Sequence, residues 1–391
     1  MLALSGERFS VDFVLHVGLL VQTWVMKTIH NSGRQHCLTT FGICLVIIAF
    51  TVVGPGCGGG SDAPTSLNLE IRDWYDLNAV RDNLDGNHSL MNNLDFTTAG
   101  YEELASPTAN EGKGWQPIGS TAENDAFVGS LDGQGYELCD LFINRPDESA
   151  VGLFGVVDAG GIIENIGIID GDITGYEDVG RLVGYSRGTV RIAYTCGNVT
   201  GYLDVGSLVG LNDGTVSSSY SSGRITGRDG IGGLVGKNEG TVSNSYSIST
   251  VNGNDFLGNL VGANVGTVSN SCAGGTANGN DFVGGLAGRN EGVVSKCYST
   301  ASVIGDEHAG GLVGQNLYGV VGNSFWDTQT SGQSTSDGGT GKITEEMMDI
   351  ATFAAAGWNI TGVADSDTRS ASHTWNIVAE ETYPFLSWQP A

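Results

Sequence analysis

Six acidic residues recur at intervals of 26 residues, with one shift of a single position, and are the clearest candidates for binding a cation: Asp178, Asp204, Asp229, Asp255, Asp281 and Glu307. Carboxylates stacked one strand spacing apart, ~4.8 Å, repel by about 3.5 kcal/mol at an effective dielectric near 20. Ca²⁺, which prefers oxygen ligands, would relieve this repulsion. We therefore predict that the six acids form one column that binds Ca²⁺ weakly, and we expect no other cofactor. The alternative is a solvated face in which Asp serves as a turn residue.

Enzymatic chemistry finds weaker support in the sequence. Glycoside hydrolysis needs two carboxylates about 5–10 Å apart with one raised pKa, but acid pairs are so abundant here that they discriminate little. A polysaccharide lyase would also need basic groups, and Arg187 and Arg191 form only a weak cluster. The zinc-protease, serine-hydrolase and phosphate-loop motifs are absent. We name no catalytic residue and predict a non-enzyme, with a carbohydrate-active enzyme as the alternative.

The N-terminal segment is typical of an export signal. Lys27 and Arg34 precede an apolar run, residues 41–53, that is shorter than the ~20 residues needed to span a bilayer. The segment 1–56 is therefore predicted to be a signal peptide whose true start is Met26. Cys57, which follows Gly56 and precedes a Gly/Ser tether over 57–66, resembles the lipidated cysteine of bacterial lipoproteins. Plain secretion is the alternative.

Internal repetition dominates the rest of the chain. Tetrapeptides of the Gly-Leu-Val-Gly type begin every 26 residues at Arg181, Ser207, Gly233, Asn259, Gly285 and Gly311. Three further sets share this period: Asn212, Asn238, Asn264, Asn290 and Asn316; Val190, Val216, Val242, Val268 and Val294; and Tyr194, Tyr220, Tyr246 and Tyr298, with Cys272 taking the place of one tyrosine.

Short strand signals separated by turn signals fill each repeat, and no stretch has helical periodicity. Identical units of this kind bury their apolar sides by stacking. The prediction is an all-β, right-handed parallel β-helix with 26-residue coils, about three strands per coil, and caps at both ends. Val and Leu would fill the interior, Gly would take positive-φ corners, and Asn would hydrogen-bond along the axis. The tyrosines would form a packing ladder or, alternatively, a ligand-stacking strip.

The stretch GLVGKNEGTVSNSYS at residues 233–247 resembles the GLUG motif repeat. The resemblance extends to the flanks, where GWQPIG at 114–119 and LDGQGY at 131–136 are similar to segments before such repeats. SFWD at 324–327 and YPFL at 383–386 are similar to segments after them. GLUG repeats occur in bacterial surface and adhesin-like proteins and beside some IgA-specific metallopeptidases. The resemblance therefore implies a β-helical surface protein.

These patterns divide the chain beyond the tether into an N-terminal cap with the first coils (67–145), the repeats (146–330) and a C-terminal cap (331–391). A short helix is expected over 76–84 with Asp76 as N-cap, and another from Thr344 to Phe353. Aromatic residues of the tail would cover the last coil or, alternatively, bind sugar. Cys272 and Cys297 should point to opposite faces of their strands, so no disulfide joins them.

The net charge of −26 excludes nucleic acid as a partner. We expect a monomeric, acidic cell-surface scaffold or adhesin-like binding protein, with glycan or protein ligands and with a lipid anchor as its link to the membrane. The expected location is the cell surface or outer membrane, as a lipoprotein, and otherwise the extracellular medium. A purely structural cell-envelope component is a further alternative.

Overall fold

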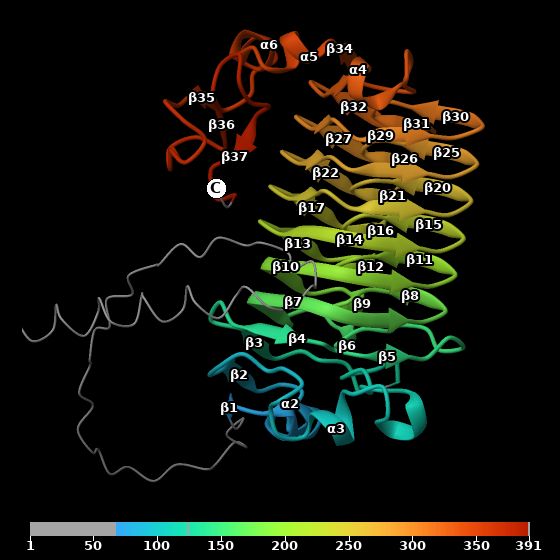
Figure 1. Ribbon diagram of the computed structural model, residues 1–391, viewed down its shortest axis with the longest axis vertical. Coiled ribbons are helices and arrows are strands. Elements are labelled where there is room, and N and C mark those ends of the chain that lie inside the picture. Colours follow the sequence, from blue (N-terminus) through green and yellow to red (C-terminus); the bar gives the residue numbers. More distant parts are fainter. Residues whose placement is uncertain (1–67, 123–124, 390–391) are drawn as a thin grey trace, which may run out of the picture. The chain divides into compact units, whose positions relative to one another are not determined.

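Each 26-residue repeat forms one coil of a parallel β-solenoid (Figure 1). The computed structural model describes residues 68–122 and 125–389; the predicted signal peptide, Cys57 and the tether lie outside these residues. One coil consists of β15 (Asp229–Gly232), β16 (Val235–Asn238), β17 (Thr241–Ser243), β18 (Tyr246–Ser247) and β19 (Thr250–Asn252). The expected three strands are thus five short ones, because corner residues such as Asn244, at φ 48°, interrupt the extended backbone.

Neighbouring coils repeat these strands in four ladders. The first contains β8 (Glu177–Val179), β11 (Leu203–Gly206), β15, β20 (Asp255–Gly258), β25 (Asp281–Gly284) and β30 (Glu307–Gly310). The second contains β6 (Phe154–Val157), β9 (Val183–Ser186), β12 (Val209–Asn212), β16, β21 (Val261–Asn264), β26 (Ala287–Asn290) and β31 (Val313–Asn316). The third contains β13 (Thr215–Ser217), β17, β22 (Thr267–Ser269), β27 (Val293–Ser295) and β32 (Val320–Gly322).

The fourth ladder contains β14 (Tyr220–Thr226), β18, β19, β23 (Cys272–Ala273), β24 (Thr276–Asn278), β28 (Tyr298–Ser299), β29 (Ser302–Ile304) and β33 (Phe325–Asp327). The long strands β7 (Ile162–Thr174) and β10 (Thr189–Thr200) run through both the third and the fourth ladders. Figure 1 shows these ladders as parallel rows of arrows along the stack.

Pairing across most of the stack follows the sequence period. Asp229 pairs with Asp255 and Tyr220 with Tyr246, each 26 residues apart. In the last coil Tyr298 pairs with Phe325, one residue out of step. The extra residue is accommodated at the turn around Tyr318, whose side chain is 100% exposed at φ 63°. An insertion at an exposed turn leaves the interior register unchanged.

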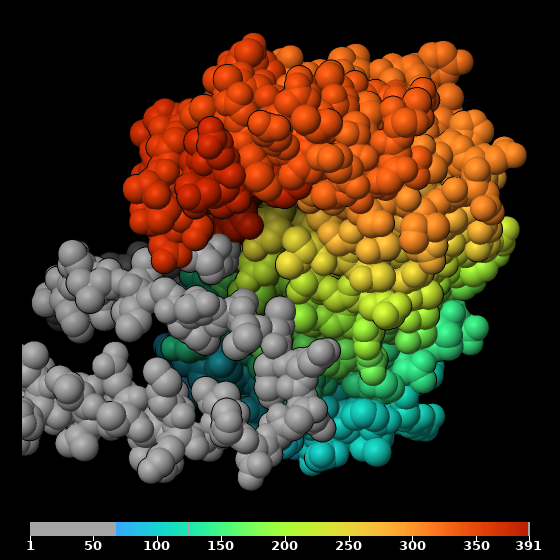
Figure 2. Space-filling view, turned by 45° about the horizontal axis from the view of Figure 1, so that its top comes forward, coloured from blue at the N-terminus to red at the C-terminus, as the bar shows by residue number. Residues whose placement is uncertain are grey.

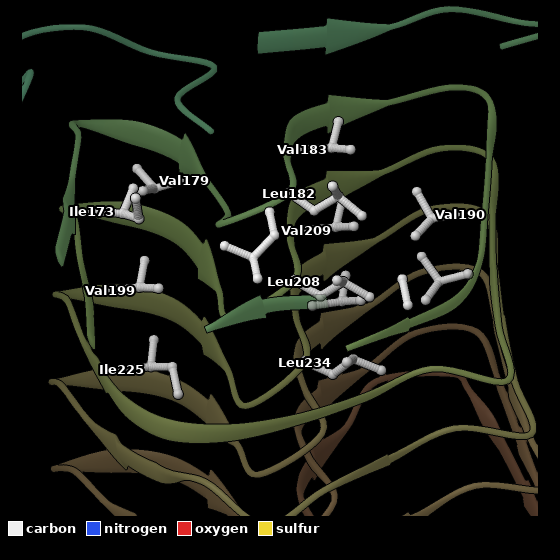
Figure 3. Close-up of a cluster of buried hydrophobic side chains, with 14 of the residues drawn as sticks. Ile173, Val179, Leu182, Val183, Val190, Val199, Leu208, Val209, Ile225 and Leu234 are labelled. Carbon is white, nitrogen blue, oxygen red and sulfur yellow. The ribbon is translucent and has the colours of Figure 1, made fainter. Parts of the chain in front are cut away.

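Aliphatic side chains fill the interior, as predicted. Leu182, Leu208 and Leu234 lie in successive coils beside Val183 and Val209 (Figure 3), and all are fully buried. Each such side chain contributes about 1.5–3 kcal/mol through removal of apolar surface from water. Because every coil buries its apolar side against its neighbours, the stack stabilises units that would not fold singly.

The repeat glycines have a different role from the predicted one. Gly236 and its equivalents do not have positive φ, and the corner positions with positive φ carry mostly other residues, such as Asn244 and Phe256. A Cβ on Gly236 would lie 2.4 Å from the backbone carbon of Asp204, and one on Gly232 would lie 1.8 Å from the carbonyl oxygen of Val235. These glycines are required because the first and second ladders approach each other closely.

The N-terminal cap combines irregular coils with short helices. It contains β1 (Leu69–Ile71), α2 (Trp74–Asn78), the 3₁₀ helix η1 (Ala79–Asp82), β2 (Asn87–Leu90), α3 (Tyr101–Leu104), the 3₁₀ helix η2 (Asn110–Gly112), β3 (Ser130–Asp132), β4 (Glu137–Cys139) and β5 (Ile143–Asn144). The N-cap of α2 is Asp73, which accepts the backbone N–H of Asp76, and not Asp76 itself. Trp74 and Trp115 are fully buried beneath the first coils.

The C-terminal cap begins where the last coil ends. It contains α4 (Thr328–Ser331), β34 (Thr340–Lys342), α5 (Thr344–Met347), α6 (Ile350–Ala355), β35 (Ile360–Gly362), β36 (Trp375–Ile377) and β37 (Phe385–Leu386). The expected helix over 344–353 is thus two short helices. The first part of the C-terminal cap covers the end of the stack. There, β34 pairs with β33, and the backbone N–H of Asp337 donates to the carbonyl of Val313.

Candidate functional site

The five sequence-predicted asparagines lie in one ladder at the end of the second set of strands. Each side-chain amide donates to the side-chain oxygen of the next, at 2.7–2.8 Å, from Asn212 through Asn316. In the first four asparagines, the side-chain amide nitrogen also lies 3.3–3.4 Å from the carbonyl oxygen of the glycine two residues later in the sequence. Since these four side chains are at most 1% exposed, the ladder stabilises the turn and offers little surface to a ligand.

The six periodic acids form two ladders where the sequence predicted a single column. Asp229, Asp255, Asp281 and Glu307 pair directly at the start of the first set of strands. Asp178 and Asp204 lie one residue further along, because Leu203 is the residue that pairs with Asp229. The expected single column is therefore wrong. Along the described part of the chain, no three His, Cys, Asp or Glu side chains gather closely enough to hold a metal ion.

Asp178 and Asp204 occupy left-handed positions at φ 54° and 50°, within the strands β8 and β11 of the first ladder. Burial, with the nearby charges of Asp204 and Glu177, raises the pKa of Asp178 to about 7. Burial also raises the pKa of Asp204 to about 6, although Lys237 opposes the shift. Two half-buried carboxyls at neighbouring coil positions thus bind protons more tightly than exposed ones do.

The periodic tyrosines lie on the outer surface of the fourth ladder, in a row that we call the aromatic column: Tyr194, Tyr220, Tyr246, Cys272, Tyr298 and Phe325. The rings of Tyr194, Tyr220 and Tyr246 are stacked, with centroids 5.1 and 4.9 Å apart. The hydroxyl of Tyr194 donates to the carboxylate of Glu137. The ring reaches that far because residue 167 is glycine, and a Cβ there would lie 2.4 Å from Cζ of Tyr194.

The aromatic tail covers the side of the stack, which differs from the predicted cover over the last coil. Trp358, Trp375 and Leu386 pack against the aromatic column in a second hydrophobic cluster. Several hydrogen bonds fix the tail to the solenoid. Among them, the Tyr298 hydroxyl donates to the Pro384 carbonyl at 2.5 Å, and the Trp358 indole donates to the Asn323 carbonyl at 2.8 Å. Figure 2 shows the cap, in red, beside the yellow and green coils. Tyr194 and Tyr220 remain half-buried.

Two shorter aromatic ladders were missed in the sequence, although their 26-residue spacing would have revealed them. Tyr176 and Tyr202 stack at 5.2 Å, and the Arg228 guanidinium lies over the Tyr202 ring. In later coils Phe256 and Phe282 stack at 5.1 Å. Stacked outward-facing rings are thus common on the corners of this solenoid.

The basic residues that favoured a lyase are engaged within the protein. Arg187 pairs with Asp158 at 3.2 Å, and Arg191 pairs with Glu164 at 2.6 Å. Arg81 shares a cavity of about 600 Å³ with Arg187, but it donates to the backbone carbonyls of Pro117 and Gln116. These contacts orient the arginines toward the protein's own acids and carbonyls.

Three of the described cysteines have free thiols: Cys139, Cys272 and Cys297. Cys297 is fully buried in the solenoid interior, whereas Cys272 belongs to the cluster between the aromatic column and the cap. The two side chains therefore lie on opposite faces of the coil wall, as predicted. Among the described residues, no helix has the length and apolarity that a membrane span requires.

Known proteins resemble parts of this chain. No protein-family model matches it. Halomucin of Haloquadratum walsbyi is 37% identical over 135 residues, which are 34% of this chain and 1% of halomucin. A protein of Evansella cellulosilytica described as a Gly-rich membrane protein is 32% identical over 155 residues, which are 37% of this chain and 17% of that protein. The chain thus spans only a small part of either relative.

Two solved structures align with this chain at low identity. A Bacteroides ovatus protein described as an immunoglobulin A1 protease has 18% identity and a TM-score of 0.46, and the match covers 82% of this chain and 92% of that one. A second, described as IgA1 protease, has 16% identity and a TM-score of 0.45, and the match covers 71% of this chain and 22% of the other.

Proposed function

We propose that this chain is an exported, non-catalytic cell-surface protein whose solenoid is a rigid, acidic display scaffold for adhesin-like binding. One observation carries the proposal: the C-terminal cap covers the aromatic column only in part, so that the rings of Tyr194 and Tyr220 are left half-buried on an outer face. A partly exposed aromatic face is typical of binding surfaces.

The two curated relatives support a surface location. One is named halomucin and the other is described as a membrane protein, and each matches this chain over only part of its own length. A repeated β-solenoid segment in such proteins is consistent with a spacer or display unit. We also propose that residues 233–247 belong to a GLUG-type repeat, on the basis of their motif and of the 26-residue coil that contains them.

Membrane attachment is proposed to come from lipidation of Cys57, which follows an apolar run and precedes a Gly/Ser segment. Surface proteolysis of intact cells, followed by fractionation, tests this part. The wild-type chain should be protease-accessible and fractionate with membranes, whereas Cys57→Ser should appear in the soluble fraction or medium. Membrane retention of Cys57→Ser would contradict the lipid anchor.

Ligand binding is tested by applying the purified full chain to an array of glycans and extracellular-matrix proteins, with product analysis on acidic polysaccharides. Saturable binding without turnover is expected. Cleaved sugar products would instead establish the carbohydrate-active alternative, which the ion-paired state of Arg187 and Arg191 disfavours. Absence of any ligand would favour a purely structural role in the cell envelope.

A further inference from the structure

We propose that the junction between the C-terminal cap and the solenoid is a binding subsite for a neutral glycan, with the ring of Trp388 as its stacking wall. The proposal rests on the proposed function as a binding protein and assigns that function to one place. Residues of two successive coils meet the tail there around a cavity of about 320 Å³: Ser218, Asn244, Asn359, Ala371, Ser372, His373, Thr374, Ser387 and Trp388. Small-molecule sites occupy about 300–1,000 Å³.

Trp388 is held in position before any ligand arrives. Its indole N–H donates to the Asn244 carbonyl at 3.0 Å. Its ring packs against Tyr246 and Tyr220, with centroids 5.8 and 6.3 Å apart. A ring fixed by packing on one side and by a hydrogen bond at its edge loses little conformational entropy when a ligand stacks on it. Trp388 is also only partly buried, and it lines the cavity.

Hydrogen-bonding groups surround this aromatic wall. Ser218 and Asn244 occupy the same corner position in neighbouring coils, both at φ 48°, about one strand spacing or ~4.8 Å apart. On the cap side, His373 is hydrogen-bonded at 3.1 Å to the hydroxyls of Ser370 and Ser372. Within the described residues, the side chains of Ser218, Asn244 and Asn359 make no hydrogen bond. Their hydroxyl and amide groups are therefore available to a ligand.

The cavity lining determines the class of ligand. It contains no Asp, Glu, Lys or Arg, although the chain as a whole carries a net charge of −26. The surrounding field repels anions, and the lining offers no cation to offset that repulsion. A pyranose ring has an apolar C–H face and a rim of hydroxyls, which match one aromatic wall and several amide and hydroxyl groups. A neutral sugar therefore fits, and an acidic polysaccharide does not.

The aromatic column extends this subsite beyond one sugar ring. Tyr220 contacts Trp388 and stacks on Tyr194, and both tyrosines are half-buried. Two residues before Tyr194 in the sequence, Ile192 is 52% exposed. A linear oligosaccharide bound at Trp388 can therefore continue along the stack over the tyrosine rings.

Titration calorimetry on the full chain tests the proposal, with linear hexasaccharides of glucose, mannose and N-acetylglucosamine as neutral probes and a galacturonate hexamer as the acidic comparison. One neutral probe should bind and the acidic one should not. Asn359→Ala, which removes an exposed amide outside the packed cluster, should weaken binding about 5–10-fold, the effect of losing one hydrogen bond of about 1 kcal/mol or slightly more. Trp388→Ala should weaken it further, and Trp388→Phe should retain part of the affinity.

Tyr318→Ala is the matched control, because that aromatic ring is fully exposed at another turn of the solenoid. It should bind as the wild type does. Neutral-sugar binding that survives both Asn359→Ala and Trp388→Ala, or preferential binding of the galacturonate hexamer, would overturn this site while leaving the proposed binding function intact. Absence of binding to every glycan and protein on the array would overturn both.

Discussion

Trp388 donates its indole N–H to the backbone carbonyl of Asn244, 3.0 Å away, although 144 positions separate the two residues. This contact joins the tail of the chain to a corner of a coil in the middle of the stack. Trp358 makes the equivalent contact to Asn323, which occupies the same left-handed corner three coils further on. The C-terminal cap is thus fastened along the side of the solenoid at repeated positions.

Removal of one of these tryptophans should release the cap and leave the coils folded. Trp358 is 5% exposed and packs on Phe353 and Trp375 at 4.9 and 5.0 Å. Trp358→Ala should cost the cap about 3–5 kcal/mol of local stability. Hydrogen exchange measured by mass spectrometry should then accelerate over residues 344–389 and remain slow in the coils. Unchanged exchange in the cap would contradict this packing, and Tyr318→Ala should leave both regions unaltered.

Asp178 should make stability depend on pH in the neutral range. Its pKa is about 7 in the folded chain against an ordinary 3.8, so its stabilising contribution is complete below about pH 3.8 and is lost as the pH rises through 7. Asp178→Asn should therefore raise the free energy of unfolding at pH 8 by on the order of 1–2 kcal/mol, after discounting for solvent screening. Urea unfolding at pH 5 and pH 8 measures the difference. If the free energy of unfolding changed with pH in parallel for the variant and the wild type, this role of Asp178 would be refuted. Asp213→Asn, at an exposed position, is the control.

The asparagine ladder should be sensitive to loss of a single member. Asn264 accepts from Asn238 at 2.8 Å and donates to Asn290 at 2.7 Å, while only 1% exposed. Asn264→Ala leaves buried partners unsatisfied and should cost about 1–3 kcal/mol. The exposed Asn278→Ala should stay within about 0.5 kcal/mol of the wild type. Equal unfolding midpoints for the two variants in denaturant titrations would show that the ladder adds nothing.

The close approach of the first two ladders should exclude any Cβ at Gly232. A Cβ there would lie 1.8 Å from the Val235 carbonyl oxygen, so Gly232→Ala forces the backbone apart and should cost at least about 1–3 kcal/mol. Gly322→Ala is the control, because no atom lies within 4 Å of the Cβ added there. Thermal unfolding of both variants compares them. A Gly232→Ala midpoint equal to that of Gly322→Ala would mean that the ladders separate readily.

Divalent cations should stabilise the stack by screening its acidic edge. The carboxylates of Asp229, Asp255, Asp281 and Glu307 belong to directly paired residues. At low ionic strength, millimolar Ca²⁺ should raise the thermal midpoint of the wild type more than that of the double variant Asp255→Asn, Asp281→Asn. Sodium chloride of matched ionic strength separates general screening from Ca²⁺ binding. If Ca²⁺ raised the thermal midpoint of the wild type no more than that of the double variant, these four acidic residues would not be the site at which Ca²⁺ acts.

The sequence by itself determined the solenoid, the length of its coils and the residues that fill it. A 26-residue period places identical side chains directly above one another, so the Leu182–Leu208–Leu234 and Asn212–Asn238 ladders follow from spacing alone. The same reasoning placed Cys272 and Cys297 on opposite faces. This reasoning failed where contacts with another ladder determine the residue type. Gly236 is an example: it is glycine because the backbone of the first ladder lies close to it, and not because its φ is positive.

Only the tertiary structure decided where the tail packs. The division of the acids, in contrast, could be read from the sequence, because Asp204 is 26 positions from Gly230 and 25 from Asp229, and the structure places it beside Gly230. The tail could have covered the last coil equally well by composition. It lies on the aromatic column instead because Tyr246, Tyr298 and Phe325 form a continuous apolar surface only once the coils are stacked. Periodicity specifies contacts between like positions, whereas contacts between unlike segments far apart in sequence require the folded chain.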